Sequence, residues 1–163
     1  MKKIVRSLVV VAMACLAGVM AGCGGGGSTA AVDTTAVSAN KLTLSVETAP
    51  AGSLIGGIQG TITLPEGYSV LTTDATGTGE TKAGEFSASG SATSSLTSAA
   101  FTKTTRTVKY GLVNASGFTG GEFATLLVQV PAGTSVNAAD FTLSENQVFD
   151  TAGKPMNLTI TKK

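Results

Sequence analysis

The chain has no histidine, no tryptophan and only two cysteines among its 163 residues. The absence of histidine excludes Ser-His-Asp triads, His-ligated metals and His acid–base chemistry. Two cysteines are too few for a cysteine-rich zinc or iron–sulfur site. Charge is also scarce, since 13% of residues are charged and the net charge is +1, which gives no reason to expect nucleic-acid binding. The composition therefore disfavours most enzyme classes, and we expect a non-catalytic protein without a cofactor.

The N-terminal segment has the pattern of a secretory signal. Its basic residues are Lys2, Lys3 and Arg6, and residues 8–21 are uncharged and apolar. This apolar run is shorter than the roughly 20 residues that a membrane-spanning helix needs. It ends in Met20-Ala21-Gly22-Cys23, which resembles a bacterial lipoprotein signal: a bulky apolar residue, two small residues and a cysteine. The alternative is an ordinary signal peptide with an incidental cysteine.

The lipoprotein resemblance implies that residues 1–22 are removed and that the Cys23 sulfur carries diacylglycerol, with a further acyl chain on the new amino group. Cys15 would leave with the signal peptide, so the mature chain could form no disulfide. Eight basic residues would then stand against ten acidic ones, a side-chain charge of −2. Two or three lipid chains hold a protein stably on a membrane. Because residue 24 is glycine rather than aspartate, analogy with enterobacterial sorting points to the outer membrane, on its periplasmic or surface face.

Residues 23–40 are expected to form a flexible tether after the lipidated cysteine. Residues 24–40 read GGGGSTAAVDTTAVSAN, a composition typical of flexible linkers. The four glycines do not form a phosphate-binding loop, because no strand precedes them and no Gly-Lys-Ser/Thr follows. The folded domain is therefore expected to span residues 41–163.

From residue 41 the hydrophobic period is two, which predicts strands and no helix. The clearest strands are expected at 42–46, 54–64, 107–114 and 122–130, and short ones at 70–71, 84–89, 98–102, 141–143, 148–149 and around 158–160. We expect about eight or nine short strands in all. Such strands bury their apolar faces by packing two sheets together. The predicted fold is all-β, an antiparallel β-sandwich of the jelly-roll or Greek-key type.

Three segments carry finer predictions. In 54–64, one parity, expected to face inward, holds Leu54, Gly56, Ile58, Gly60, Ile62 and Leu64. Glycines on an inward face mark a bulge or a close approach. In 122–130, one face is expected to carry Ala124, Leu126, Val128 and Val130, and the other Phe123 and Leu127. A strand that is apolar on both faces suits the centre of a sandwich. Residues 72–105 are rich in Thr, Ser, Ala and Gly, so we expect mobile loops there. The isolated apolar anchors of this middle segment are Phe86, Leu96 and Phe101.

Three stretches resemble cohesin-like modules. They are LTLSVETAPAGSLIGGIQGTITL at 42–64, VKYGLVNASGFTGGEFATLLVQVPA at 108–132 and FTLSENQVFDTAGKPMNLTI at 141–160. The shared features are a strand, Pro/Gly turn and strand at the start, a Gly-Glu before an apolar strand, and an Asp-x-x-Gly turn near the end. The resemblance implies a β-sandwich that makes protein–protein or protein–polysaccharide contacts without catalysis.

Candidate metal ligands are few. Asp74, Thr76, Thr78 and Glu80 recur at every second position, and oxygen ligands at such spacing can bind Ca²⁺. A solvated loop is the favoured interpretation, because only the two ends are acidic. Asp150 precedes Ala152-Gly153 and is expected to be a turn residue that caps its own backbone, with calcium binding as the alternative.

Candidate ligand-binding residues are also few. Tyr68 and Phe118 lie beside turn residues and are the aromatic candidates for exposed contacts, whereas Phe86 and Tyr110 are expected in the core. The carboxylates Glu80 and Glu85 are the nearest to a glycosidase pair, but both lie in loop-like sequence. A small basic cluster is formed by Lys103, Arg106 and Lys109, and we interpret it as a solvated edge strand.

Two functions are consistent with these features. The favoured one is a lipid-anchored protein-interaction or adhesion module of the cell envelope. The alternative is a polysaccharide-binding module, which would need exposed aromatic side chains on a sheet face. Aromatic residues make up only 5% of the chain, and this favours the first function.

Overall fold

The computed structural model describes residues 38–163, so the predictions for the signal peptide, Cys23 and most of the tether lie outside the described residues. The strands are β1 (Ser38–Val46), β2 (Ile55–Thr63), β3 (Gly79–Glu80), β4 (Phe86–Ala88), β5 (Leu96–Thr102), β6 (Thr107–Phe118), β7 (Gly121–Val130), β8 (Thr142–Asp150), β9 (Pro155–Met156) and β10 (Ile160–Lys162). Two 3₁₀ turns, η1 (Gly90–Ala92) and η2 (Ala138–Asp140), are the helical elements of this region. Within it, no helix is long and apolar enough to cross a membrane.

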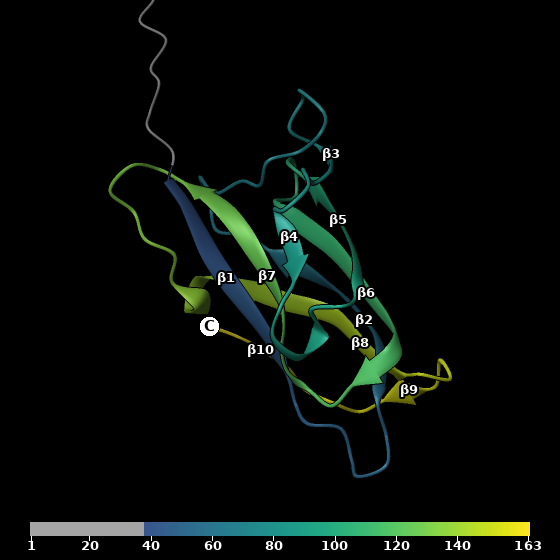
Figure 1. The fold of residues 1–163 in the computed structure, drawn as a ribbon. Coiled ribbons are helices and arrows are strands. Elements are labelled where there is room, and N and C mark those ends of the chain that lie inside the picture. Colours follow the sequence, from purple (N-terminus) through teal and green to yellow (C-terminus); the bar gives the residue numbers. More distant parts are fainter. Residues whose placement is uncertain (1–37) are drawn as a thin grey trace, which may run out of the picture. The chain divides into compact units, whose positions relative to one another are not determined.

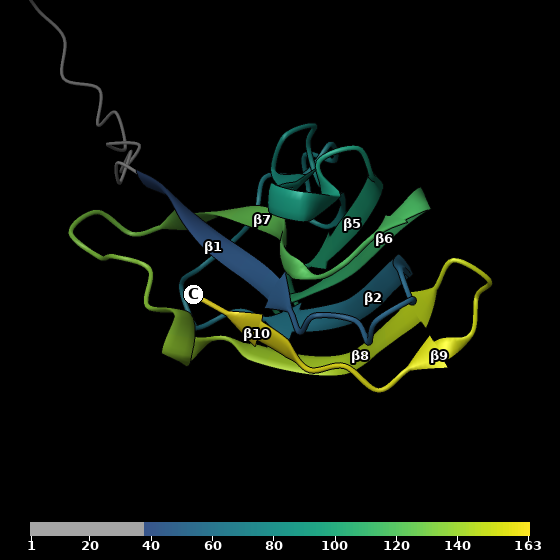
Figure 2. The ribbon, with the colours of Figure 1, turned by 60° about the horizontal axis from the view of Figure 1, so that its bottom comes forward.

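The strands form two antiparallel sheets (Figure 1). The four-stranded sheet has the order β10-β1-β7-β4, and the six-stranded sheet has the order β3-β5-β6-β2-β8-β9. Figure 2, turned from the first view, shows β1 and β10 in one layer and β2 and β8 in the other. The predicted all-β antiparallel sandwich is confirmed, with ten strands in the described region rather than eight or nine.

The core lies between the sheets and is built from alternating side chains. β1 contributes Leu42 and Leu44, β7 contributes Leu126 and Val128, and β2 contributes Ile58 and Ile62, all at most 2% exposed. Each such side chain stabilises the fold by about 1.5–3 kcal/mol relative to an exposed one. The period of two therefore fixes which face of each strand points inward.

Gly56 forms a bulge in β2, as its position on an inward face predicted. Ile55 pairs with Asp150 and Gly57 with Phe149, so Gly56 is an extra residue relative to β8. A Cβ on Gly56 would lie 2.6 Å from the Thr151 Cα, which leaves room only for glycine. The bulge also changes the side-chain order: Ile55 is fully buried whereas Leu54 is 40% exposed, so the prediction that Leu54 shares the inward parity was wrong.

A second bulge lies in β7. Leu44 pairs with Ala124 and Ser45 with Glu122, so Phe123 is the extra residue. Phe123 and Ala124 are both fully buried, and the ring centroids of Phe123 and Tyr110 are 6.4 Å apart. The prediction that Phe123 points away from Ala124 was therefore wrong, because a bulge lets two successive residues face the core.

Other boundaries differ from those predicted. Residues 70–71 are not a strand, although isolated bridges join Ser69 to Gln129 and Thr72 to Thr81. The two strands expected at 141–143 and 148–149 are one, β8. In the segment 72–105, β4 and β5 lie at the short strands expected at 84–89 and 98–102, whereas β3 and η1 lie where we expected loops. Ser38–Asn40, assigned to the tether, form the start of β1.

Candidate interaction surface

The outer face of the six-stranded sheet carries a row of apolar residues. Leu96 of β5 pairs with Val113 of β6, Val113 pairs with Gly57 of β2, and Gly57 pairs with Phe149 of β8. Leu96 is 79% exposed and Val113 is 61% exposed. These four residues, called the apolar row below, line a shallow depression of about 400 Å³. Exposed apolar side chains that adjoin one another are typical of surfaces that bind another molecule.

A polar row lies beside the apolar row on the same face. The Gln59 Nε2 donates a hydrogen bond to Gln147 Oε1 at 2.6 Å, and the Thr61 hydroxyl donates to Glu145 Oε2 at 2.8 Å. Both bonds join β2 to β8. Cross-strand bonds between side chains restrict their rotamers, so the face presents a fixed set of polar groups next to the apolar row.

A bulge in β8 places Glu145 on this face. Gln59 pairs with Gln147 and Thr61 with Ser144, so two residues of β8 oppose Gly60. Glu145 has φ 54°, a left-handed conformation that is uncommon for residues other than glycine. Strained backbone of this kind concentrates at functional sites, although it has structural roles as well.

Tyr110 supports the sheet beneath the bulge. Its hydroxyl donates a hydrogen bond to Asn146 Oδ1 at 3.1 Å, and burial raises the pKa of this phenol. A Cβ on Gly60 would lie 2.7 Å from the Tyr110 hydroxyl oxygen, so glycine makes room for the contact. The prediction that Gly60 marks a close approach is confirmed. Tyr110 and Phe86 are buried, as predicted.

The aromatic candidates for exposed contacts have other roles. Phe118 is only 4% exposed, because it lies at the end of β6 and pairs with Ile55 of β2. Its predicted exposure was therefore wrong. Tyr68 is half-buried: its ring meets that of Phe141 edge-on at 5.9 Å and its hydroxyl donates to the Ser135 carbonyl. None of the tyrosine or phenylalanine side chains, all of which lie within 38–163, belongs to the exposed class.

The acidic candidates are bound to their own backbone. Asp74 Oδ1 accepts a hydrogen bond from the Thr76 N–H at 2.7 Å, and this bond lowers the pKa of Asp74. Asp150 Oδ1 accepts from the N–H groups of Ala152 and Lys154, as predicted for a turn residue. Glu80 is exposed. Within 38–163, no group of three or more acidic or cysteine side chains is placed to hold a metal ion.

Glu80 and Glu85 lie in separate sheets. Glu80 belongs to β3 of the six-stranded sheet, whereas Glu85 directly precedes β4 of the four-stranded sheet. Glu85 is 8% exposed, and its Oε2 has no hydrogen-bond partner. Burial raises the pKa of Glu85, although the Leu71 N–H and the Lys82 charge oppose this shift.

The basic cluster does not lie on an edge strand, so our prediction was wrong. Lys109 lies on β6, which pairs with β5 on one side and β2 on the other. Lys103 and Arg106 lie in the β5–β6 turn, where the Arg106 Nε donates to the Leu64 carbonyl at 3.3 Å. The strand nearer the sheet edge is β5, which carries no charged residue.

The apolar row was missed by the sequence analysis, which assigned Leu96 to the core as an anchor. Leu96 is instead the most exposed of the large hydrophobic side chains in the described region. The position of Val113 in the alternation of its strand could have indicated this exposed apolar surface. Val113 stands out of phase with Val108, Tyr110 and Leu112, so it had to face away from the core they share.

The architecture defines a class: two packed antiparallel sheets in a cohesin-like β-sandwich. Among solved structures, the chain is similar to a non-cellulosomal cohesin from the hyperthermophilic archaeon Archaeoglobus fulgidus. The TM-score is 0.53, the sequence identity is 16%, and the match covers 74% of this chain and 74% of that one. No protein-family model and no curated protein sequence matches the chain. The likeness at this identity concerns the fold, and it confirms the predicted cohesin-like β-sandwich.

Proposed function

We propose that this chain is a non-catalytic, lipid-anchored protein of the cell envelope whose sandwich binds a protein partner through the outer face of the six-stranded sheet. The observation that carries this proposal is the apolar row, in which the exposed Leu96 and Val113 adjoin each other. The fixed polar groups of Gln59 and Gln147 flank it. Apolar anchors surrounded by polar groups are the usual anatomy of a protein–protein interface. The cohesin-like fold is consistent with this function but does not establish it.

The surface favours a protein over a polysaccharide. Sugars bind to exposed aromatic rings, whereas the aromatic side chains of this domain are buried or half-buried. Phe149, the aromatic member of the apolar row, is half-buried, and the exposed members Leu96 and Val113 are aliphatic. Aliphatic side chains pack well against the side chains of another protein.

Quantitative affinity capture from an envelope extract of the source organism tests the partner. The full-length protein, the Val113→Lys variant and the control Leu71→Lys would be compared in detergent. Leu71 is also an exposed aliphatic residue, but it lies outside the apolar row. We expect a protein that the wild type and the control enrich equally and that Val113→Lys captures roughly tenfold less. Equal capture by all three proteins, or retention of the wild type on polysaccharide gels instead, would contradict the proposal.

The lipid anchor needs a separate test, because Cys23 lies outside the described residues. We expect labelled fatty acid to be incorporated into the wild-type chain and not into Cys23→Ala. Cys15→Ala is the matched control, since this cysteine belongs to the proposed signal peptide. Incorporation that survives in Cys23→Ala would show that the anchor is not at this residue.

A further inference from the structure

One side of the sandwich is bordered by two strand edges. β4 pairs with β7 on one side and has no other strand partner in the described region. β5 pairs with β6 along its whole length, but with β3 only at Ala100 and Phe101. The Thr81 N–H still donates to the Ala99 carbonyl at 3.0 Å, and then the chain turns away, because the Lys82 N–H bonds to the Leu71 carbonyl. Among residues 38–163, no strand therefore lies beside the edge of β5 before Ala99.

The alternation of β5 shows which backbone groups face that edge. Phe101 pairs with Gly79 and the Ala99 carbonyl accepts from Thr81, so the odd-numbered residues point their N–H and C=O groups away from β6. In an antiparallel ladder this alternation is strict. The N–H and C=O of Thr97 and the N–H of Ala99 consequently point to the open edge. These groups form a template for one more strand.

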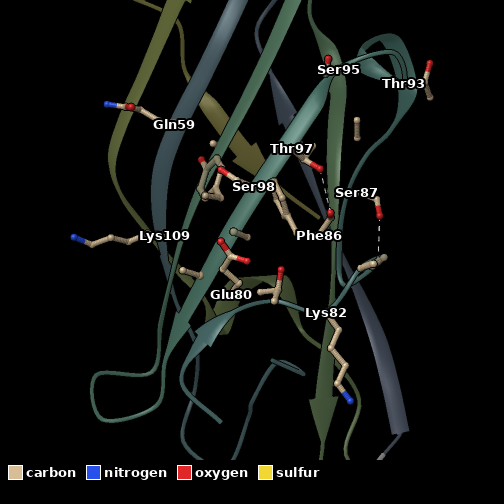
Figure 3. Close-up of a pocket in the computed structure, with 18 residues that line it drawn as sticks. Gln59, Glu80, Lys82, Phe86, Ser87, Thr93, Ser95, Thr97, Ser98 and Lys109 are labelled. Atoms are coloured by element: carbon tan, nitrogen blue, oxygen red, sulfur yellow. Dashed lines mark hydrogen bonds between the residues drawn. The ribbon is translucent and has the colours of Figure 1, made fainter. Parts of the chain in front are cut away.

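A cleft of about 970 Å³ adjoins this edge. Its lining comes mainly from β5, β4 and the loops beside them, and it extends to Gln59, Lys109 and Gly111 on the outer face of β2 and β6. Most of the lining residues are glycine, alanine, serine or threonine. The Thr97 hydroxyl donates a hydrogen bond to the Phe86 carbonyl at 3.4 Å, so β5 and β4 are in contact at this point of the cleft (Figure 3). The long side chains of Lys82 and Lys109 extend away from the space (Figure 3). The cleft thus presents mainly small side chains and backbone groups, and Glu80 adds a carboxylate to its lining.

The second wall of the cleft is also a strand edge. The Glu85 carbonyl accepts from the Leu127 N–H and the Ser89 N–H bonds to the Phe123 carbonyl. The odd-numbered residues of this segment therefore bond to β7, and the backbone groups of Phe86 and Ala88 point toward the cleft. The Phe86 carbonyl already accepts the Thr97 hydroxyl, so an occupant would bond to the other edge groups, and an extended polypeptide supplies the evenly spaced N–H and C=O groups that this needs.

Open edges are usually protected by lysine, proline or a covering loop. Residues 96–99 of β5 read Leu-Thr-Ser-Ala and contain neither lysine nor proline. β3 already occupies the position of the next strand for two residues, so an added strand would continue its line. The Thr97 hydroxyl contacts the Phe86 carbonyl at 3.4 Å, so the cleft is narrow at this point and a segment with small side chains suits it best.

We propose that the cleft binds an extended peptide segment of another protein, with small side chains, as an additional strand on the edge of β5. This site adjoins the apolar row and shares Gln59, Thr97 and Ser98 with the lining of its depression, but Leu96 and Val113 do not line the cleft. The binding energy would come mainly from backbone hydrogen bonds to Thr97 and Ala99, so recognition would depend on strand conformation more than on sequence.

Two peptides test the proposal on the full-length protein in detergent. One is a short synthetic peptide of alternating threonine and alanine, and the other has the same sequence with every backbone nitrogen methylated. We expect the first to slow amide hydrogen exchange at Thr97 and Ala99 by about tenfold or more, and the methylated one to have no effect. If the unmethylated peptide leaves exchange unchanged at millimolar concentration, or if both peptides act equally, the proposal is overturned.

Two variants of one residue complete the test. Thr97→Pro removes the edge-facing N–H, and proline is tolerated where that group faces away from the ladder. Thr97→Val keeps the N–H and loses the hydroxyl bond to Phe86. We expect Thr97→Val to bind the peptide as the wild type does, and Thr97→Pro to bind it about tenfold more weakly. Equal binding by both variants would overturn the proposal.

The test of peptide binding can fail or succeed independently of the test for the envelope partner. Val113→Lys should lose the envelope partner and keep the peptide, whereas Thr97→Pro should do the reverse. Protection by an oligosaccharide, with none by the peptide, would identify the cleft as a sugar site and refute the peptide proposal.

Discussion

Gly56 and Gly57 are neighbours in β2, and replacing each by alanine should give opposite results. A Cβ on Gly56 would lie 2.6 Å from the Thr151 Cα and 2.7 Å from the Asp150 carbonyl oxygen. A Cβ on Gly57 would have its nearest neighbour, the Leu112 carbonyl oxygen, at 3.6 Å, which is an ordinary contact. Neither glycine has a positive φ, so backbone conformation does not separate the two variants.

The expected magnitudes follow from these distances. Replacing glycine by alanine at a compatible position stabilises a protein by about 0.4–1 kcal/mol, because the unfolded chain loses conformational freedom. Gly57→Ala should show this gain. Gly56→Ala must also move the backbone of the β8–β9 turn, and overpacking of this kind costs about 1–3 kcal/mol. The two variants should therefore differ by about 1–3 kcal/mol, or roughly 3–15 °C in Tm for a domain of this size.

Thermal unfolding followed by far-UV circular dichroism would measure the difference. The wild type and both variants need the same buffer and the same protein concentration. If Gly56→Ala unfolds within roughly 0.5 kcal/mol of Gly57→Ala, the Asp150–Thr151 backbone does not approach Gly56, and the bulge in β2 is misplaced.

Three further predictions concern the acidic residues. Burial raises the pKa of Glu85, so its protonated form stabilises the fold, and this contribution is lost as pH rises through that pKa. In urea unfolding, the free energy of unfolding of Glu85→Gln should exceed that of the wild type by about 1 kcal/mol at neutral pH, and this difference should close toward pH 4. A difference that does not change with pH would refute the prediction. Asp150→Ala should lower the free energy of unfolding by about 1–2 kcal/mol, and Asp150→Asn should lower it much less, because an amide oxygen can still accept the two backbone hydrogen bonds. Equal losses in the two variants would contradict the role of Asp150 in the turn. Millimolar Ca²⁺ should leave Tm unchanged, because Asp74 and Asp150 accept bonds from their own backbone, and a rise in Tm would show that calcium binds.

The fold class could be predicted from the sequence because it depends on periodicity. The alternation of Leu42, Leu44 and Val46 predicts a half-buried strand, and these residues are buried in β1. The inward glycines Gly56 and Gly60 predicted close approaches that the structure contains. Such features are local and follow from the pleat of a strand.

The errors arose where register depends on a bulge. One extra residue reverses the side-chain order, and nothing near Ile55 or Phe123 marks which residue that will be. Phe118 seemed exposed because glycines surround it, but its pairing with Ile55 across the sheet buries it. The apolar row depends on the pairing of Leu96 with Val113, and this long-range pairing is invisible in either strand alone.

The long ladder between β1 and β7 has a mechanical consequence. β1 begins at Ser38 and pairs with β7 from Ser38 to Val46. Hydrogen bonds in an antiparallel ladder run across the strands, so a pull on Ser38 along β1 loads these bonds in shear and together, rather than opening them one at a time. If the domain is held at one end by a tether and on the opposite sheet by a partner, the force between them passes through this ladder. The first strand is then the element that sets how much tension the attachment withstands.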